Sequence, residues 1–292
     1  MIAVVLSLAA ALTFSLSALL INTLAGRVGV FQLARWQMAM AFVLTATASV
    51  ILGGWRLIDA RQFWLLAGSS ATGIMLASAT YFAAIYAAGP RLTALLFALA
   101  APFAVIEGYL FLGETLGLWQ GVGITLILVG IVLAIVTAND SHPDDAPRRP
   151  LWQGITLGII TAIGQATGSL LARPAMESGA EPFTAMAIRS GLGAAFFVVL
   201  MVFPFARSAR LPTAPEMRTV GMSAFLGMFL GMSLMMAALT SGRVGIVSTL
   251  TSTTPILILP MIWYATRRAP APGAWIGAAL AVLGTALISL AA

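Results

Sequence analysis

The sequence predicts an all-α membrane protein in which ten transmembrane helices form two inverted five-helix repeats. The first observation is composition: 60% of the 292 residues are hydrophobic and 8% are charged, whereas a soluble domain is about half apolar and about a quarter charged. This excludes a soluble enzyme or a DNA-binding protein. The second observation is that landmarks of the first half recur in the second half at an offset of 152–154 residues.

Each predicted helix is an apolar stretch that ends at Gly, Pro, Asp or Arg. A helix that crosses a bilayer needs about 20 mostly apolar residues. The predicted helices span 3–25, 31–53, 62–87, 92–111, 119–138, 152–175, 183–204, 217–240, 244–264 and 272–291. The first is interpreted as a retained helix and not a signal peptide, because no basic residue occurs among the first 26 residues. The connections are short, so the helices must carry the function.

The internal repeat divides the chain into a first five-helix repeat (1–138), a linker loop (139–151) and a second five-helix repeat (152–292). The recurring pairs are Arg35 and Arg189, Gly89 and Gly242, Pro102 and Pro255, Gly123 and Gly277, and Gly130 and Gly284. Because five is odd, the second repeat enters the membrane from the opposite side. Inverted repeats of this kind allow alternating access to a site near the midplane. The alternative is a duplicated membrane scaffold, or a partner-binding protein, without transport.

The last two helices of each half carry a further pattern. In "ALLFALAAPFAVIEGYLFLGETLGLWQGVGITLILVGIVLAIV" (94–136) a short helix with a central Pro precedes Leu-Gly-Glu and a helix with spaced Gly. Its partner is 246–290, in which Arg267 stands where Glu114 would recur. With Arg35 in "FQLARWQMAMAF", these segments resemble the drug/metabolite transporter superfamily, in its ten-helix EamA-type branch. The resemblance covers the whole chain and implies an exporter of amino acids, including aromatic ones, or of other small metabolites.

The orientation predicted from the Arg residues differs from the one that the resemblance implies. The loops on the side of the termini carry Arg56, Arg61, Arg173 and Arg243, and the opposite loops carry Arg27, Arg91, Arg148, Arg149, Arg207, Arg210, Arg218, Arg267 and Arg268. The positive-inside rule alone therefore places the termini outside. The first two loops point the other way, and the resemblance implies cytoplasmic termini, which we adopt. We expect a multi-pass protein of a bacterial inner (plasma) membrane, monomeric because one chain holds both halves.

Pro102 and Pro255 each remove a backbone hydrogen bond, so both helices are expected to bend and line a cavity. The helix that contains Pro255 carries six hydroxyl residues between 248 and 254, where the first half has Leu and Ala. Ser248, Thr251, Ser252 and Pro255 share a face and are predicted to contact the substrate. The alternative for the hydroxyls is that they only hold neighbouring helices together by interhelical hydrogen bonds.

Further substrate-binding candidates come from other helices: Ser15, Tyr81, Phe82, Phe97, Gln165, Ser169, Met232 and Met235. The Gln165 amide offers donors and acceptors that complement an amino acid. Aromatic and thioether side chains suit an adaptable apolar wall. Interhelical hydrogen bonding and core packing are the alternatives.

Glu107 is an intramembrane acid and a weak candidate for a proton carrier, against a structural role near a helix end. Arg35 and Arg189 are interpreted as structural residues that tie helix ends to carbonyls or to Glu114. The glycines at 123, 130, 277 and 284 predict that 119–138 and 272–291 pack as a rigid post.

Catalysis is not predicted. All 15 basic residues are Arg, and the chain has no Cys, so amine and thiolate chemistry are excluded. His142 lies in the linker, so an intramembrane Ser has no base. Asp140, His142, Asp144 and Asp145 are interpreted as a solvated loop and not as a metal site. No cofactor, metal or nucleic-acid partner is expected; the partners are a small-molecule substrate and the lipid bilayer.

Overall fold

The structure is a computed structural model that describes residues 1–24, 27–88, 93, 96–137, 150–206, 210–266 and 271–290. The regular elements within these ranges are all helical. Six helical stretches of the described chain are long and apolar enough to cross a membrane: Ile2–Ile21, Val30–Leu52, Ala60–Tyr81, Trp152–Glu177, Pro182–Val202 and Ala214–Leu239. The remaining apolar helices, Ala100–Leu112, Leu118–Leu133 and Pro272–Leu287, are shorter.

The first half follows the predicted order. Its elements are α1 (Ile2–Thr23), α2 (Val30–Leu52), the 3₁₀ turn η1 (Gly54–Arg56), α3 (Ala60–Ser70), the π-helix η2 (Ala71–Leu76), α4 (Ala77–Ala88), α6 (Ala100–Leu112) and α7 (Leu118–Thr137). The third predicted helix is therefore continuous but contains a π segment.

The second half repeats this order. Its elements are α8 (Leu151–Glu177), α9 (Pro182–Val199), the 3₁₀ turns η4 (Leu200–Val202) and η5 (Pro204–Ala206), α10 (Ala214–Ser223), the π-helix η6 (Ala224–Gly231), α11 (Met232–Leu239), α12 (Val244–Thr251), α13 (Thr254–Thr266) and α14 (Pro272–Leu290). The two π-helices begin 153 residues apart, at Ala71 and Ala224, which is the offset of the sequence repeat.

Several helix ends follow from local side chains. Asp59 and Gln62 form a reciprocal capping box at the start of α3, and Thr213 and Glu216 form one at the start of α10. Such boxes satisfy backbone N–H groups that a helix leaves unpaired. Gly113 ends α6 with φ of 63°, a left-handed conformation that glycine adopts without steric cost.

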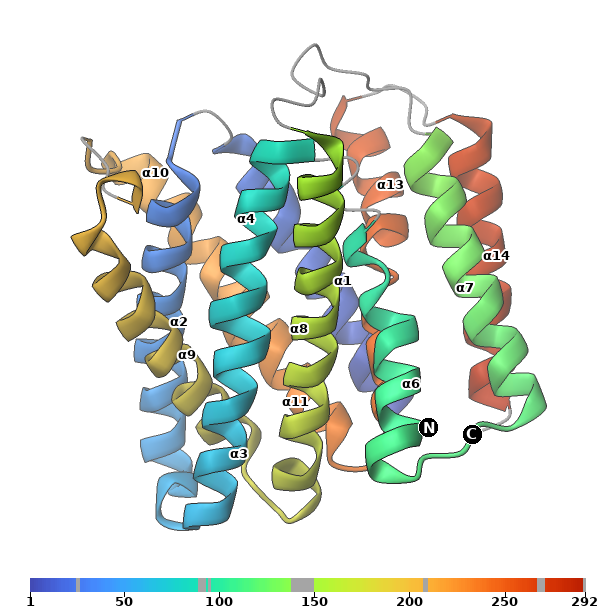
Figure 1. Cartoon of the computed structure of the whole chain (residues 1–292), viewed down its shortest axis with the longest axis horizontal. Coiled ribbons are helices and arrows are strands. Elements are labelled where there is room, and N and C mark those ends of the chain that lie inside the picture. The colour runs from blue at the N-terminus through green and yellow to red at the C-terminus, as the bar shows by residue number, and fades with distance from the viewer. Residues whose placement is uncertain are drawn as a thin grey trace.

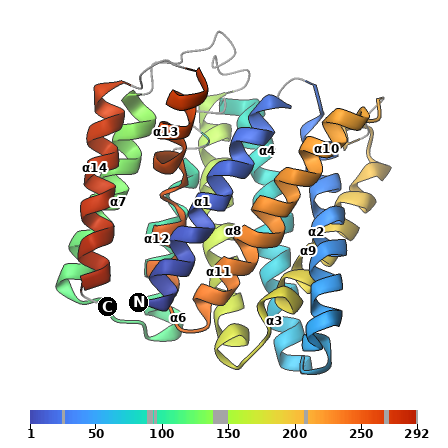
Figure 2. The ribbon, with the colours of Figure 1, turned by 180° about the vertical axis from the view of Figure 1, so that it is seen from behind.

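The helices form a single bundle in which the halves are interleaved (Figures 1 and 2). α1 begins and α14 ends at the lower end in Figure 1, whereas α8 begins at the upper end and runs in the opposite direction to α1. α1 packs on η6 and α11 of the second half, and α8 packs on α3, η2 and α4 of the first. The first helix of each repeat therefore packs on the third helix of the other repeat.

Two helices of the first half pack on their own repeat counterparts: α2 packs on α9, and α7 packs on α14. In the second pair, a Cβ added at Gly130 would meet the Gly277 carbonyl oxygen, and one added at Gly284 would meet the Gly123 carbonyl oxygen. The predicted post of spaced glycines is therefore confirmed.

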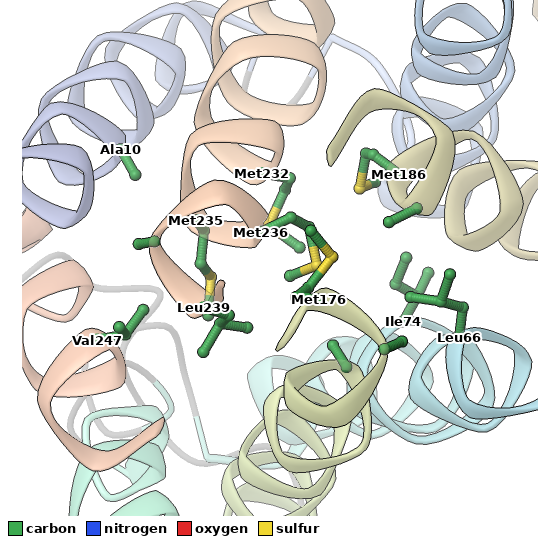
Figure 3. Packing of buried hydrophobic residues seen from close by; sticks show 14 of the residues in the cluster. Ala10, Leu66, Ile74, Met176, Met186, Met232, Met235, Met236, Leu239 and Val247 are labelled. Atoms are coloured by element: carbon green, nitrogen blue, oxygen red, sulfur yellow. The ribbon is translucent and has the colours of Figure 1, made fainter. Parts of the chain in front are cut away.

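The largest buried cluster lies between α8, α9 and α11 and is rich in methionine. Figure 3 shows Met176, Met186, Met232, Met235 and Met236 pointing into this region. Flexible thioethers fill irregular space between helices, so this core can change shape more easily than one of branched side chains.

Candidate functional site

A central cavity of about 410 Å³ lies where the two halves meet. Its walls come from α1, α2, the α3–η2–α4 helix, the segment that leads into α6, α8, η6 with α11, and α12 with the start of α13. The substrate-binding candidates predicted from the sequence lie on all of these helices except α2, which contributes Met38 to the wall. Ligand cavities for small molecules are typically about 300–1,000 Å³, so this one can enclose a metabolite.

Eight residues predicted to bind substrate line the cavity: Tyr81, Phe97, Gln165, Met232, Met235, Ser248, Thr251 and Ser252. They come from both halves of the chain. Their shared position places polar and apolar groups around one volume.

Four other candidates lie outside the cavity wall. The Ser15 hydroxyl is 2.8 Å from the Ala11 carbonyl oxygen and 3.0 Å from that of Thr254, so it links α1 to the start of α13. The Ser169 hydroxyl donates to the Gln165 carbonyl at 3.2 Å. Pro102 stands in the first turn of α6, and Glu107 faces Thr167 on α8. The side chains of Phe82 and Pro255 lie outside the described residues.

The two proline helices are broken and not merely bent. Residues 98–99 separate a short helical segment from α6, and residues 252–253 separate α12 from α13. The first break lies three to four residues before Pro102, and the second lies two to three residues before Pro255. A proline inside a continuous helix clashes with the carbonyl four positions earlier, which places both breaks next to that carbonyl. Both prolines then fall in the first turn of the next helix, where a missing N–H costs little.

The hydroxyl-rich helix mostly satisfies its own hydroxyls. Thr251 Oγ1 donates to the Val247 carbonyl at 2.9 Å, and Ser252 Oγ donates to the Ser248 carbonyl at 2.8 Å. Thr254 Oγ1 donates at 2.8 Å to the carbonyl of Thr251 at the break. Back-bonding of this kind lets a hydroxyl face an apolar environment at low cost.

Three polar side chains of the wall make no hydrogen bond with the described part of the chain: Ser78, Gln165 and Ser248. Ser78 and Gln165 come from helices that face each other, α4 and α8, and Ser248 comes from α12. An amide and two hydroxyls can donate to and accept from a polar solute. These groups are therefore open to a ligand.

The remaining wall is apolar and adaptable. The rings of Tyr81 and Phe97 meet edge to face with centroids 5.6 Å apart. Met232 and Met235 of α11 also line the cavity (Figure 3). An aromatic face and mobile thioethers suit a solute with an apolar body.

The hydropathy pattern did not reveal the π segments, which supply Gly73, Ile74 and Met228 to the wall. π-helical turns are rare and frequently occur at functional sites. The usable signal was the pair of glycines at the contact of η2 with α8: a Cβ at Gly73 would lie 3.1 Å from the Gly168 Cα, and one at Gly168 would lie 2.6 Å from the Gly73 Cα. Phe14, Met38 and Ser78 also line the cavity and were not predicted.

A polar network joins the α6–α7 connection, which lies at the lower end of the bundle in Figure 1, to α8 and α12. Glu114 Oε1 accepts from the Val244 backbone N–H at 2.9 Å and lies 3.9 Å from Arg173 Nε. Arg243 donates to Gln120 Oε1 at 2.8 Å. The expected pairing of Glu114 with Arg35 or Arg189 is therefore wrong: the α6–α7 connection is held to α8 and α12 instead.

The described residues hold no group of three or more acidic, His or Cys side chains that could bind a metal ion. Asp140, His142, Asp144 and Asp145 lie outside the described residues.

Comparison with known proteins agrees with this geometry. The EamA-like transporter family matches residues 1–136 and 152–290, one match for each half. The chain is also similar to a solved structure, described only as the crystal structure of a protein, with a TM-score of 0.84 and 19% sequence identity. That similarity covers 99% of this chain and 97% of the other and shows a shared fold. No curated protein matches the chain.

Proposed function

Because the chain belongs to the EamA-like transporter family, we propose that it is a secondary transporter that exports small organic metabolites. The observation that supports this best is the cavity of about 410 Å³ at the junction of the halves, with the open polar groups of Ser78, Gln165 and Ser248 in its wall. A duplicated scaffold needs neither a central cavity nor unpaired polar side chains inside it.

The mechanism we propose is alternating access by two inverted five-helix repeats that together span the membrane ten times. The opposite directions of α1 and α8, and the exchange of packing partners between the repeats, support inversion. The two broken helices supply matched hinges next to the cavity. A carrier of this kind rocks its halves around a fixed site.

The substrate class we propose is amino acids, aromatic ones included. Gln165 and Ser248 can bind a polar end, and Tyr81, Phe97 and Met232 can enclose a ring. Within this proposal the protein is a monomer of a bacterial inner membrane with cytoplasmic termini.

The test is uptake of labelled amino acids into liposomes that contain the purified protein. Uptake should saturate with concentration. Gln165→Leu replaces the amide with a branched apolar side chain that is one atom shorter, and we expect it to reduce uptake about tenfold, the factor that roughly 1.4 kcal/mol of hydrogen bonding supplies. Thr156→Val on the same helix is the matched control, because its hydroxyl donates to the Trp152 carbonyl of its own helix and lies outside the cavity wall. Saturable uptake that Gln165→Leu leaves unchanged would contradict the proposed site, and no uptake over a broad panel would favour the scaffold.

Energy coupling is tested in the same liposomes. Glu107 Oε1 accepts from Thr167 at 2.9 Å, and its Oε2 is buried without a partner among the described residues. If this carboxyl carries protons, an imposed pH gradient drives accumulation, and Glu107→Gln abolishes the accumulation while leaving downhill exchange. Uptake that stops at equal concentrations inside and outside and does not respond to the pH gradient indicates a passive carrier.

A further inference from the structure

Arg189 is a fully buried cation near the cavity. It lies on α9 with 1% of its surface exposed. Its Nη1 donates to the Met236 sulfur at 3.3 Å, and its Nε is buried without a hydrogen-bond partner. A guanidinium has five donors and keeps its charge in proteins, so this hydrogen bonding is poor for so buried a group.

No acid of the described chain neutralises Arg189. Asp59 and Glu181 cap helices, Glu107 faces Thr167, and Glu114 binds the Val244 N–H. Glu177 pairs with Arg173 and Glu216 with Arg210. The other three acids of the chain, at 140, 144 and 145, belong to the linker outside the described residues. A buried charge without a partner is strongly destabilising, and in a membrane such a residue marks a functional site whose partner must be found.

The guanidinium lies one residue layer behind the cavity wall. A Cβ added at Gly73, which lines the cavity, would come within 3.3 Å of Arg189 Nη2. Because Gly73 has no side chain, only the backbone of η2 separates the Arg189 guanidinium from the cavity at this position. One turn along α9, a Cβ at Gly193 would meet Ile74, another lining residue, at 2.8 Å. The same face of α9 therefore backs the cavity.

The wall itself carries no charge among the described residues. The charge of Arg189 therefore lies behind a wall without charge of its own, and an apolar surrounding screens its field weakly. The repeat counterpart, Arg35, is only partly buried and is not part of the cavity wall. The positive field is thus a property of one side of the site.

We propose that Arg189 makes this cavity select solutes that carry a carboxylate, with the substrate's own carboxylate as the missing counter-charge. The inference rests on the proposed transport function and narrows its substrate class: the carboxylate end of the solute lies toward η2, and the apolar end lies against Tyr81, Phe97 and the α11 methionines.

The test uses sets of three solutes with one side group and different charges. The phenyl set is 3-phenylpropionate, L-phenylalanine and 2-phenylethylamine, and matching sets carry indole and isobutyl groups. Binding is measured as thermal stabilisation of the purified full-length protein, and transport as competition with labelled uptake. We expect both carboxylates to bind at least about tenfold more tightly than the amine, the factor that roughly 1.4 kcal/mol of charge interaction supplies.

Variants then assign the preference to the residue. Arg189→Met removes the charge and should abolish the preference, whereas Arg189→Lys should retain most of it. Arg35→Met is the matched control and should leave the preference unchanged. The preference of the unaltered protein needs no variant, so it remains a test if Arg189→Met does not fold.

The outcomes separate the two proposals. Uptake of carboxylates and amines with equal affinity, or an unchanged preference in Arg189→Met, would overturn the role of Arg189 and keep the transport function. Arg189-dependent binding of carboxylates without any uptake would overturn the transport function and keep the role of Arg189 in binding. If no set binds and none is transported, both proposals are wrong.

Discussion

Two pairs of repeat-related segments pack on each other, one at the edge of the bundle (Figures 1 and 2) and one beside the cavity, and they differ in what the repeat has kept. In α7 and α14, glycines face backbone reciprocally: Gly130 meets Gly277, and Gly284 meets Gly123. In the broken pair, made of residues 96–112 and 244–266, both halves keep the proline and the break. Their side chains differ, with Leu and Ala in the first half and Ser and Thr in the second. The packing is repeated where it holds the halves together, and the side chains diverge where the cavity wall is formed.

The largest effect should come from the repeated packing. Gly130→Ala places a Cβ against the backbone of Gly277 and Ala281, which cannot move aside as a side chain can. We expect a loss of about 1–3 kcal/mol in stability, seen as a lower thermal midpoint of the purified protein in detergent. Gly284→Ala should cost a similar amount, because its contact is the repeat counterpart.

Gly121→Ala is the control on the same helix. Nothing lies within 4 Å of a Cβ at this position, so the better helix propensity of Ala should keep or raise the midpoint. Equal losses for Gly121→Ala and Gly130→Ala would mean that close packing of α7 on α14 does not hold the halves together.

A smaller effect should come from restoring the broken helices. Pro102→Ala returns an N–H that can donate to the residue 98 carbonyl and join the two segments. One backbone hydrogen bond contributes about 1 kcal/mol, or about fivefold in an equilibrium. If the break is a hinge, transport should slow by about that factor. Pro255→Ala should slow it less, because Thr254 already occupies the Thr251 carbonyl.

The measurement is the initial rate of uptake at saturating substrate, with protein stability measured in parallel. Unchanged rates in both variants would show that the breaks shape the wall without moving. A larger effect at Pro255 than at Pro102 would reverse the comparison between the two halves.

The sequence predicted the helices well because a bilayer imposes long apolar stretches. Six of the predicted stretches coincide to within a few residues with helices that are long and apolar enough to cross a membrane. The other four contain described helices, and the stretches at 92–111 and 244–264 are broken at residues 98–99 and 252–253. The position of the breaks follows from Pro102 and Pro255, since proline acts through local geometry. The change from α-helical to π-helical hydrogen bonding leaves no such pattern in the sequence, so the π-helices η2 and η6 were not predicted.

The wall was predicted only in part because a hydroxyl in an apolar helix has several possible partners. Ser15 and Ser248 have similar surroundings in the sequence, yet Ser15 bonds to carbonyls of α1 and α13 and Ser248 opens into the cavity. The difference arises from helix rotation and packing, which hydropathy does not specify. Arg189 is fully buried and Arg35 only partly buried for the same reason, although both occupy equivalent places in the repeat.

The smallest effects should separate hydroxyls within the second broken helix itself. Ser248→Ala removes a hydroxyl that lines the cavity and makes no hydrogen bond with the described chain. If this hydroxyl binds the solute as proposed, KM should rise about threefold. Thr251→Val keeps nearly the same side-chain volume and removes a hydroxyl whose oxygen lies 2.9 Å from the Val247 carbonyl oxygen and 3.1 Å from that of Ser248. Uptake should then change by less than about twofold, because the bonds lost lie within the helix. A larger rise in KM for Thr251→Val than for Ser248→Ala would mean that the helix rearranges its hydroxyls when solute binds. The hydrogen bonds of Thr251 described above would then not be kept in the complex with solute.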